Sequence, residues 1–93
     1  MLFMVIERFK DGDERRVGER FRNHGRMMPA EVVYLASWIC PATMRCFQLM
    51  EASTRAALQP WVEHWSDLVE FEVIAVETST EFWAKRAGFR KRP

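Results

Sequence analysis

The stretch that decides the fold is residues 31–52, EVVYLASWICPATMRCFQLMEA. Both of its ends are rich in β-branched and aromatic side chains, a composition that favours β-strands. The tripeptide Pro41-Ala42-Thr43 between them is short and carries turn chemistry. The sequence therefore predicts strands over residues 31–40 and 45–52 that pair as an antiparallel hairpin.

A register in which Cys40 faces Cys46 sorts these side chains onto two faces. One face would be purely aliphatic and aromatic, with Val33, Leu35, Ile39, Phe47 and Leu49. We expect helices to cover this face. Its predicted contacts are Val17, Phe21, Leu58 and Trp65. The other face would mix rings with polar groups, with Tyr34, Ala36, Trp38, Cys40, Cys46, Gln48 and Met50.

The segment before the hairpin predicts a strand and a helix. Residues 2–9 form an apolar run typical of a buried strand, and Asp11-Gly12-Asp13 offers a turn and a helix N-cap. Apolar or aromatic residues and one histidine then recur every three or four positions, at Val17, Phe21, His24 and Met28. This spacing predicts an amphipathic helix that ends near Pro29.

The segment after the hairpin predicts a second helix, a fourth strand and a short third helix. Ser53 or Thr54 can cap the second helix, and Pro60 should kink it or mark a restart. Its apolar stripe is Leu58, Trp61, Val62 and Trp65. Residues 70–77 alternate like a strand, and residues 79–81 open the third helix, which Gly88 should end.

The resulting order is β-α-β-β-α-β, the split β-α-β pattern of an α+β, ferredoxin-like fold with a four-stranded antiparallel sheet. We expect one domain over residues 1–84, followed by a basic tail over residues 85–93. The positive charges of this tail are Lys85, Arg86, Arg90, Lys91 and Arg92. The tail could touch an acidic partner, although a solvated or partner-pinned terminus is the more common use of such a segment.

Composition limits the classes of function. The chain has 93 residues, is 48% hydrophobic and carries a net charge of +1. These values argue against disorder and against a charge-driven nucleic-acid or membrane partner. The first apolar run is too short for a signal peptide, and no stretch approaches a membrane span. We therefore expect a cytoplasmic protein whose two cysteines stay reduced.

The candidate ligand-binding residues are Glu7, Tyr34, Trp38 and Gln48, which would share the uncovered sheet face. Two rings, an amide and a carboxylate could hold a flat or carbonyl-bearing small molecule. They could equally hydrogen-bond across a dimer interface, and the two readings are compatible. His24 is the candidate catalytic acid or base, and its alternative role is a histidine at the edge of the core.

Other kinds of site find little support in the sequence. The histidines and cysteines lack the spacing of a metal site, so no metal and no cofactor are expected. Phosphate-binding glycine loops are missing. The third strand, with Arg45-Cys46-Phe47-Gln48-Leu49, does not carry the basic-Gly-aromatic signature of RNA-recognition domains. We expect no nucleic-acid partner.

Four segments of the chain carry a resemblance to a known family: MLFMVIE (1–7), ASW (36–38), CFQLME (46–51) and WSDLVEFEV (65–73). Together they resemble a bacterial domain-of-unknown-function family, number 3303. The resemblance covers nearly all of residues 1–84. It implies membership of the dimeric α+β barrel group, which includes small isomerases, cofactor-free monooxygenases and haem-degrading enzymes. Haem-degrading members of this group use an Asn, a Trp and a His in the pocket; the first strand here has Glu7 and no Asn, so that chemistry is not supported.

The sequence and the resemblance together lead to two functional hypotheses. The first is a homodimer, joined through the open sheet face, that binds a small organic ligand and works as a cofactor-free isomerase-like or monooxygenase-like enzyme. The second is a non-catalytic interaction or stress-adaptation protein whose open face is filled by its partner. An enclosed cavity would favour the first hypothesis.

Overall fold

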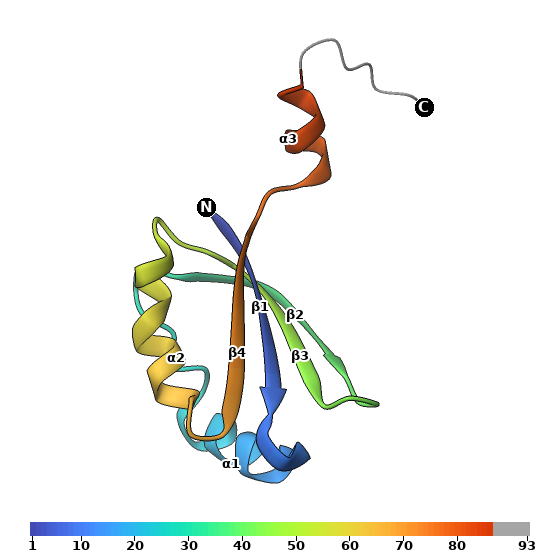
Figure 1. Cartoon of the computed structure of the whole chain (residues 1–93). Coiled ribbons are helices and arrows are strands. Elements are labelled where there is room, and N and C mark those ends of the chain that lie inside the picture. Colours follow the sequence, from blue (N-terminus) through green and yellow to red (C-terminus); the bar gives the residue numbers. More distant parts are fainter. Residues whose placement is uncertain (87–93) are drawn as a thin grey trace.

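A computed structural model describes residues 1–86 of the chain and shows a four-stranded antiparallel sheet with two helices on one face (Figure 1). The strands lie in the order β2-β3-β1-β4. Their bounds, in chain order, are β1 Leu2–Phe9, β2 Val33–Cys40, β3 Arg45–Glu51 and β4 Val69–Val76. The helices are α1 Glu14–His24, α2 Gln59–Trp65 and α3 Ser79–Ala84. The predicted element order and ferredoxin-like topology are confirmed.

The predicted register of the hairpin is wrong by one residue. Cys40 pairs with Arg45, and Cys46 pairs with Ile39. The turn closes over four residues, with Met44 in the left-handed region at φ 50°. Such a conformation is uncommon for a residue other than glycine, and the local sequence does not predict it. Because side chains alternate along a strand, a slip of one residue exchanges the two faces of one strand relative to its partner.

The slip inverts the predicted faces of β3. Cys46, Gln48 and Met50 are buried beneath the helices, whereas Phe47 and Leu49 are only partly buried and belong to the opposite, open face. The predicted core residues Leu35 and Ile39 are 47% and 57% exposed. Strand β2 is an edge strand with an irregularity between Tyr34 and Ala36, so it makes less of the core than its composition suggests.

The core lies between α2 and the centre of the sheet. Its largest fully buried side chains are Trp61, Phe3, Met50, Leu58, Val5 and Val69. The predicted stripe of the second helix is confirmed at Leu58, Trp61 and Trp65. The predicted restart at Pro60 is also confirmed, because a 3₁₀ turn over Arg55–Leu58 precedes α2 and the proline occupies its first turn.

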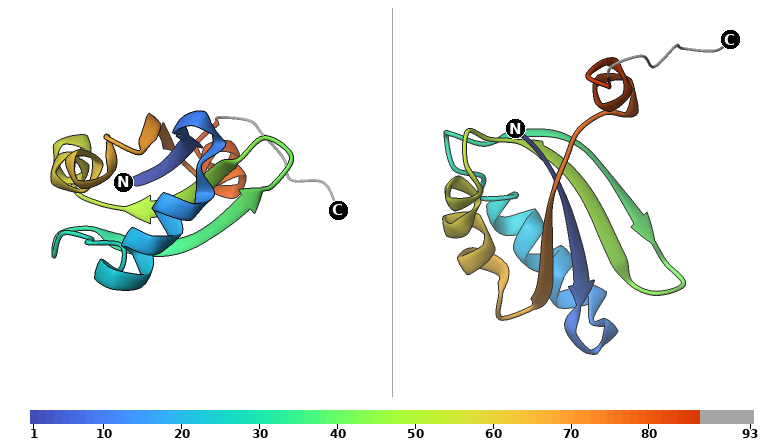
Figure 2. Two further views of the ribbon diagram at one scale, coloured as in Figure 1. Left: turned by 90° about the horizontal axis from the view of Figure 1, so that it is seen from below. Right: turned by 45° about the horizontal axis from the view of Figure 1, so that its top comes forward.

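Helix α1 lies across one end of the sheet (Figure 2) and has no fully buried residue. It begins where the Asp13 side chain accepts a hydrogen bond from the Arg16 amide, as the predicted cap requires. It ends at His24, earlier than predicted, because Gly25 adopts φ 66°. Since α1 rests only lightly on the sheet, space remains beneath it.

Within residues 1–86, no helix covers the second face of the sheet, and α3 projects past the end of the sheet beyond β4 (Figure 1). None of its residues is buried. Thr78 caps it by accepting from the Glu81 amide at 3.0 Å. The predicted stop at Gly88 and most of the basic tail lie outside the described residues, of which Lys85 and Arg86 are the last. Lys85 pairs with Glu77.

Candidate functional site

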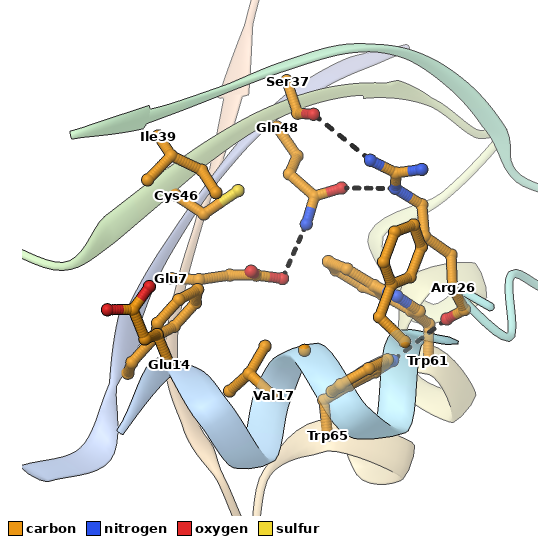
Figure 3. A pocket seen from close by; sticks show the side chains of 13 residues that line it. Glu7, Glu14, Val17, Arg26, Ser37, Ile39, Cys46, Gln48, Trp61 and Trp65 are labelled. Atoms are coloured by element: carbon orange, nitrogen blue, oxygen red, sulfur yellow. Dashed lines mark hydrogen bonds between the residues drawn. The ribbon is translucent and has the colours of Figure 1, made fainter. Parts of the chain in front are cut away.

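A cavity of about 280 Å³ lies between α1 and the helix-covered face of the sheet (Figure 3). Every strand except β4 contributes to it, together with α1, α2 and the segment after α1. The lining residues are Glu7, Phe9, Glu14, Val17, Gly18, Phe21, Arg26, Ser37, Ile39, Cys46, Gln48, Trp61 and Trp65. The cavity is therefore on the opposite side of the sheet from the face where a pocket was predicted.

The polar floor of the cavity is made by Glu7 and Gln48, which are both 6% exposed. They come from neighbouring strands β1 and β3 and point to the same side of the sheet. The Gln48 amide donates from Nε2 to Oε2 of Glu7 at 2.8 Å. Figure 3 shows this bond in the middle of the cavity, with Val17 of α1 on the far side. The amide satisfies one carboxyl oxygen without adding charge.

Arg26 closes one side of the cavity and links α1 to the sheet. Its Nε donates to Oε1 of Gln48 at 3.3 Å, and its Nη2 donates to Oγ of Ser37 at 3.2 Å. Its guanidinium lies 3.8 Å from the Tyr34 ring centroid, a cation–π distance. The Tyr34 hydroxyl and Ser37 Oγ are 2.7 Å apart. A continuous polar chain thus runs from Tyr34 to the buried carboxyl of Glu7.

Burial raises the pKa of Glu7 from 4.5 to about 7. Hydrogen bonds from Gln48 and Cys46 and the positive charge of Arg26 lower the pKa, but they do not offset the loss of hydration. No ion pair to Glu7 forms within the part of the chain that the structure describes. The carboxyl can therefore gain or lose a proton near neutral pH.

The Cys46 thiol beside Glu7 stays protonated. Burial, followed by the negative charge of Glu7, raises the pKa of Cys46 to about 12. A protonated thiol is a much poorer nucleophile than a thiolate, so Cys46 lines the cavity without acting as a nucleophile. Cys40 and Cys46 are both free and are not cross-strand partners, since Cys40 pairs with Arg45.

The structure brings together some of the predicted site residues and separates others. Glu7 and Gln48 share the cavity floor, and Tyr34 contacts Arg26 at its edge. Trp38 lies on the open face, pairs with Phe47 and is 56% exposed, so the prediction that it faces Gln48 is wrong. His24 is exposed and lines a separate shallow hollow with Arg16, Glu19, Arg20, Asn23 and Leu68.

Among the cavity residues that the sequence did not reveal as part of a site are Gly18, Arg26 and Ser37. Gly18 lies in the middle of α1, and a Cβ placed on it would meet no atom within 4 Å. Glycine inside a helix costs roughly 0.5–1 kcal/mol relative to alanine. A glycine within a predicted amphipathic helix was the signal that could have pointed to this position. For Arg26 and Ser37 there was none, because their contacts depend on the loop and on the hairpin register.

The described residues give no sign of a metal centre or of a membrane span. Across residues 1–86, no three His, Cys, Asp or Glu side chains gather in a group able to hold a metal ion. Within the same residues, no helix is both long and apolar enough to cross a bilayer.

Comparison with known proteins identifies one family. A search of curated proteins finds no match. A search of solved structures finds none either. The model of the family described as "Domain of unknown function (DUF3303)" matches residues 1–89, which is almost the whole chain. The chain therefore belongs to the DUF3303 family.

Proposed function

We propose that the protein is a homodimeric domain that binds a small organic molecule in the cavity beneath α1, with Glu7 as the group that exchanges a proton with the ligand. The observation that carries this proposal is the buried carboxyl on the floor of a cavity with mostly apolar walls. Ligand sites commonly combine apolar walls with a few well-placed polar groups. Here the polar chain from Tyr34 to Glu7 supplies those groups.

The cavity volume suits a ligand of one or two rings. Engineered cavities of about 150 Å³ bind benzene, and this cavity measures about 280 Å³. Phe21, Trp61 and Trp65 line it, so flat molecules would find aromatic surface on more than one side. Glu14 and Phe21 belong to the lining and are also exposed to solvent.

A carboxyl with a pKa of about 7 is suited to general acid or base catalysis at neutral pH. The buried thiol of Cys46 offers no competing nucleophile. Proton transfer is therefore the reaction type that the site supports best, without any need for a second catalytic group. In this proposal Glu7 takes the acid or base role for which His24 was the sequence-based candidate.

The homodimer is proposed from the uncovered face of the sheet. This face carries the apolar side chains of alternate strand residues, among them Met4, Ile6, Trp38, Phe47, Leu49 and Ile74. Contiguous apolar patches beyond a few hundred Å² are uncommon on monomers. A second copy of the same chain offers an equally apolar partner, and a twofold interface would cover both faces at once.

The tryptophans give a direct test of the cavity. Trp61 and Trp65 line it, whereas Trp38 lies on the opposite face and Trp83 on α3. The test is an NMR titration of ¹⁵N-labelled protein with four single-ring probes, namely benzylamine, benzyl alcohol, acetophenone and benzoate. At least one should shift the indole signals of the two cavity tryptophans before those of the other two.

The matched variant is Gly18→Leu, which should block the cavity without disturbing the fold. A Cβ at residue 18 meets no atom within 4 Å, and leucine is a better helix former than glycine. The variant should keep its thermal stability and lose the probe-induced shifts of Trp61 and Trp65. Shifts confined to Trp38, or shifts that persist in Gly18→Leu, would place binding elsewhere. No shift with any probe would favour the interaction-protein alternative.

A further inference from the structure

We infer that the ligand of this cavity is a small organic cation, a ring-bearing amine whose ammonium group pairs with Glu7; this inference rests on the proposed function. The starting point is a carboxyl that is 6% exposed and that forms no ion pair within residues 1–86. Buried carboxylates are normally paired, because an isolated buried charge is costly. A cationic ligand would supply the missing partner.

Among residues 1–86, Arg26 is the one cation that lines the cavity, and its guanidinium is bonded to other groups. The Arg26 guanidinium donates to Ser37 Oγ and Gln48 Oε1, and the Gln48 amide stands between Arg26 and Glu7. Arg26 is further held between the rings of Phe21 and Tyr34, at 5.2 and 3.8 Å from their centroids. Moving it toward Glu7 would sacrifice these contacts. Arg26 therefore forms part of the cavity lining and does not form an ion pair with the Glu7 carboxylate.

The hydrogen-bonding groups of the lining favour a ligand that donates. The Trp65 indole donates to the Arg26 carbonyl at 3.0 Å, and the Gln48 amide already donates to Glu7. The Trp61 Nε1 is buried and has no hydrogen-bond partner among the described residues. Two carboxyl groups line the cavity as acceptors, that of Glu7 on the floor and that of Glu14.

An ammonium group fits this set of partners. It has three donors and no acceptor, and an ionised carboxylate only accepts, so the pair forms charge-assisted hydrogen bonds. Phe21, Trp61 and Trp65 line the same space, and aromatic faces attract cations. An anionic ligand would meet two carboxyl groups, and within residues 1–86 the Arg26 guanidinium of the lining is already bonded to Gln48 and Ser37. A neutral oxygen acceptor would have to rely on a protonated Glu7.

The sharpest test compares benzylamine with benzyl alcohol, which has nearly the same shape and no charge. Above about pH 8 Glu7 is ionised, and we expect calorimetric titration to show benzylamine binding about tenfold or more tightly than benzyl alcohol. In Glu7→Gln the two probes should bind equally. Glu14→Gln is the matched control, since it removes the other carboxyl of the lining and should keep most of the preference.

The number of protons released on benzylamine binding is a second measurement, and it would not change if Glu7 had only a structural role. Glu7 is faced by the Cys46 thiol, which stays protonated, and by the charges of Arg26 and Glu14. At about pH 6 most Glu7 carboxyls are protonated. Benzylamine binding should therefore release close to one proton, measured as a difference between buffers of unequal ionisation enthalpy, and Glu7→Gln should release none.

The outcomes separate the inference from the proposed function. Equal or tighter binding of benzyl alcohol, acetophenone or benzoate, with shifts at Trp61 and Trp65, would overturn the amine assignment while supporting the cavity as the site. A benzylamine preference that survives in Glu7→Gln would also overturn it. Failure of all four probes to shift these two indoles would instead overturn the proposed function itself.

Discussion

At the scale of single residues, the cavity is organised by one glutamate that the fold removes from water. Glu7 occupies a position of β1 whose neighbours on the same face, Val5 and Phe9, are buried apolar residues. Glu7 points to the same covered side of the sheet as these two residues and lines the cavity. The Gln48 amide satisfies one oxygen but does not neutralise charge, and the pKa of Glu7 rises to about 7 as a result.

This environment makes a prediction about stability and pH. Because the pKa of Glu7 is higher in the folded state, folding favours its protonated form. The resulting stabilisation is fully present below about pH 4.5 and is lost progressively as the pH rises to about 7. The loss corresponds to roughly 3 kcal/mol of unfolding free energy at about 1.4 kcal/mol per tenfold change. Glu7→Gln, which mimics the protonated shape, should remove this loss.

Urea denaturation of both proteins between about pH 4 and pH 8 measures the effect. The difference in unfolding free energy between Glu7→Gln and wild type should grow across this range. Ionisations elsewhere, including that of Asp67 beside Arg20, are common to both proteins and cancel in the difference. A difference that stays constant with pH would show that Glu7 is hydrated in the folded protein.

At the scale of elements, α1 covers the cavity and is attached to the rest of the protein by a few contacts. It buries no residue completely, so its position depends on the cap at Asp13, the contacts of Val17 and the Arg26 bonds that follow it. The Arg20–Asp67 pair, with bonds of 2.7 Å, adds a link to the segment after α2. Detachment of α1 from the sheet would therefore open the cavity.

The cap makes this testable. Asp13→Ala removes the acceptor of the Arg16 amide and should cost about 0.5–2 kcal/mol of stability, measured by urea denaturation. The exposed residue Glu19 lies within the same helix, and Glu19→Ala serves as the control with an effect of at most a few tenths of a kcal/mol. Equal costs for both variants would mean that the cap does not hold α1.

At the scale of the whole molecule, one face of the sheet is covered and the other is open. The open face carries Trp38, which is 56% exposed, and Ile74, which is 38% exposed. Helix α3 extends past the sheet, and a helix of six residues has little stability by itself. Both features are consistent with the proposed second copy of the chain, which would cover the face.

The dimer can be tested by light scattering at micromolar concentration. Wild-type protein should have twice the monomer mass of 11.0 kDa. Trp38→Glu places a charge in the proposed interface and should shift the mass toward the monomer, while Arg22→Glu on the exposed side of α1 should not. A wild-type monomer would refute the proposed interface, as would a dimer that Trp38→Glu leaves intact.

The sequence by itself determined the order of the elements and most of their bounds. Leu2–Phe9 has the bounds that the apolar run predicted, and the break at Pro60 falls where the sequence placed it. Both signals are local, because the period of the side chains and the geometry of proline act within a few residues. Glu7 and Gln48 also stood out in the sequence as polar residues within apolar strands.

Only the tertiary structure decided which face of β3 is buried and where the cavity lies. The side-chain period of a strand assigns residues to two faces, but it does not say which face meets the helices. Here the four-residue turn with Met44 at φ 50° fixed the register and turned Cys46 and Gln48 toward α1. The partners of Glu7 follow from that register, since they come from strands and loops far apart in the chain.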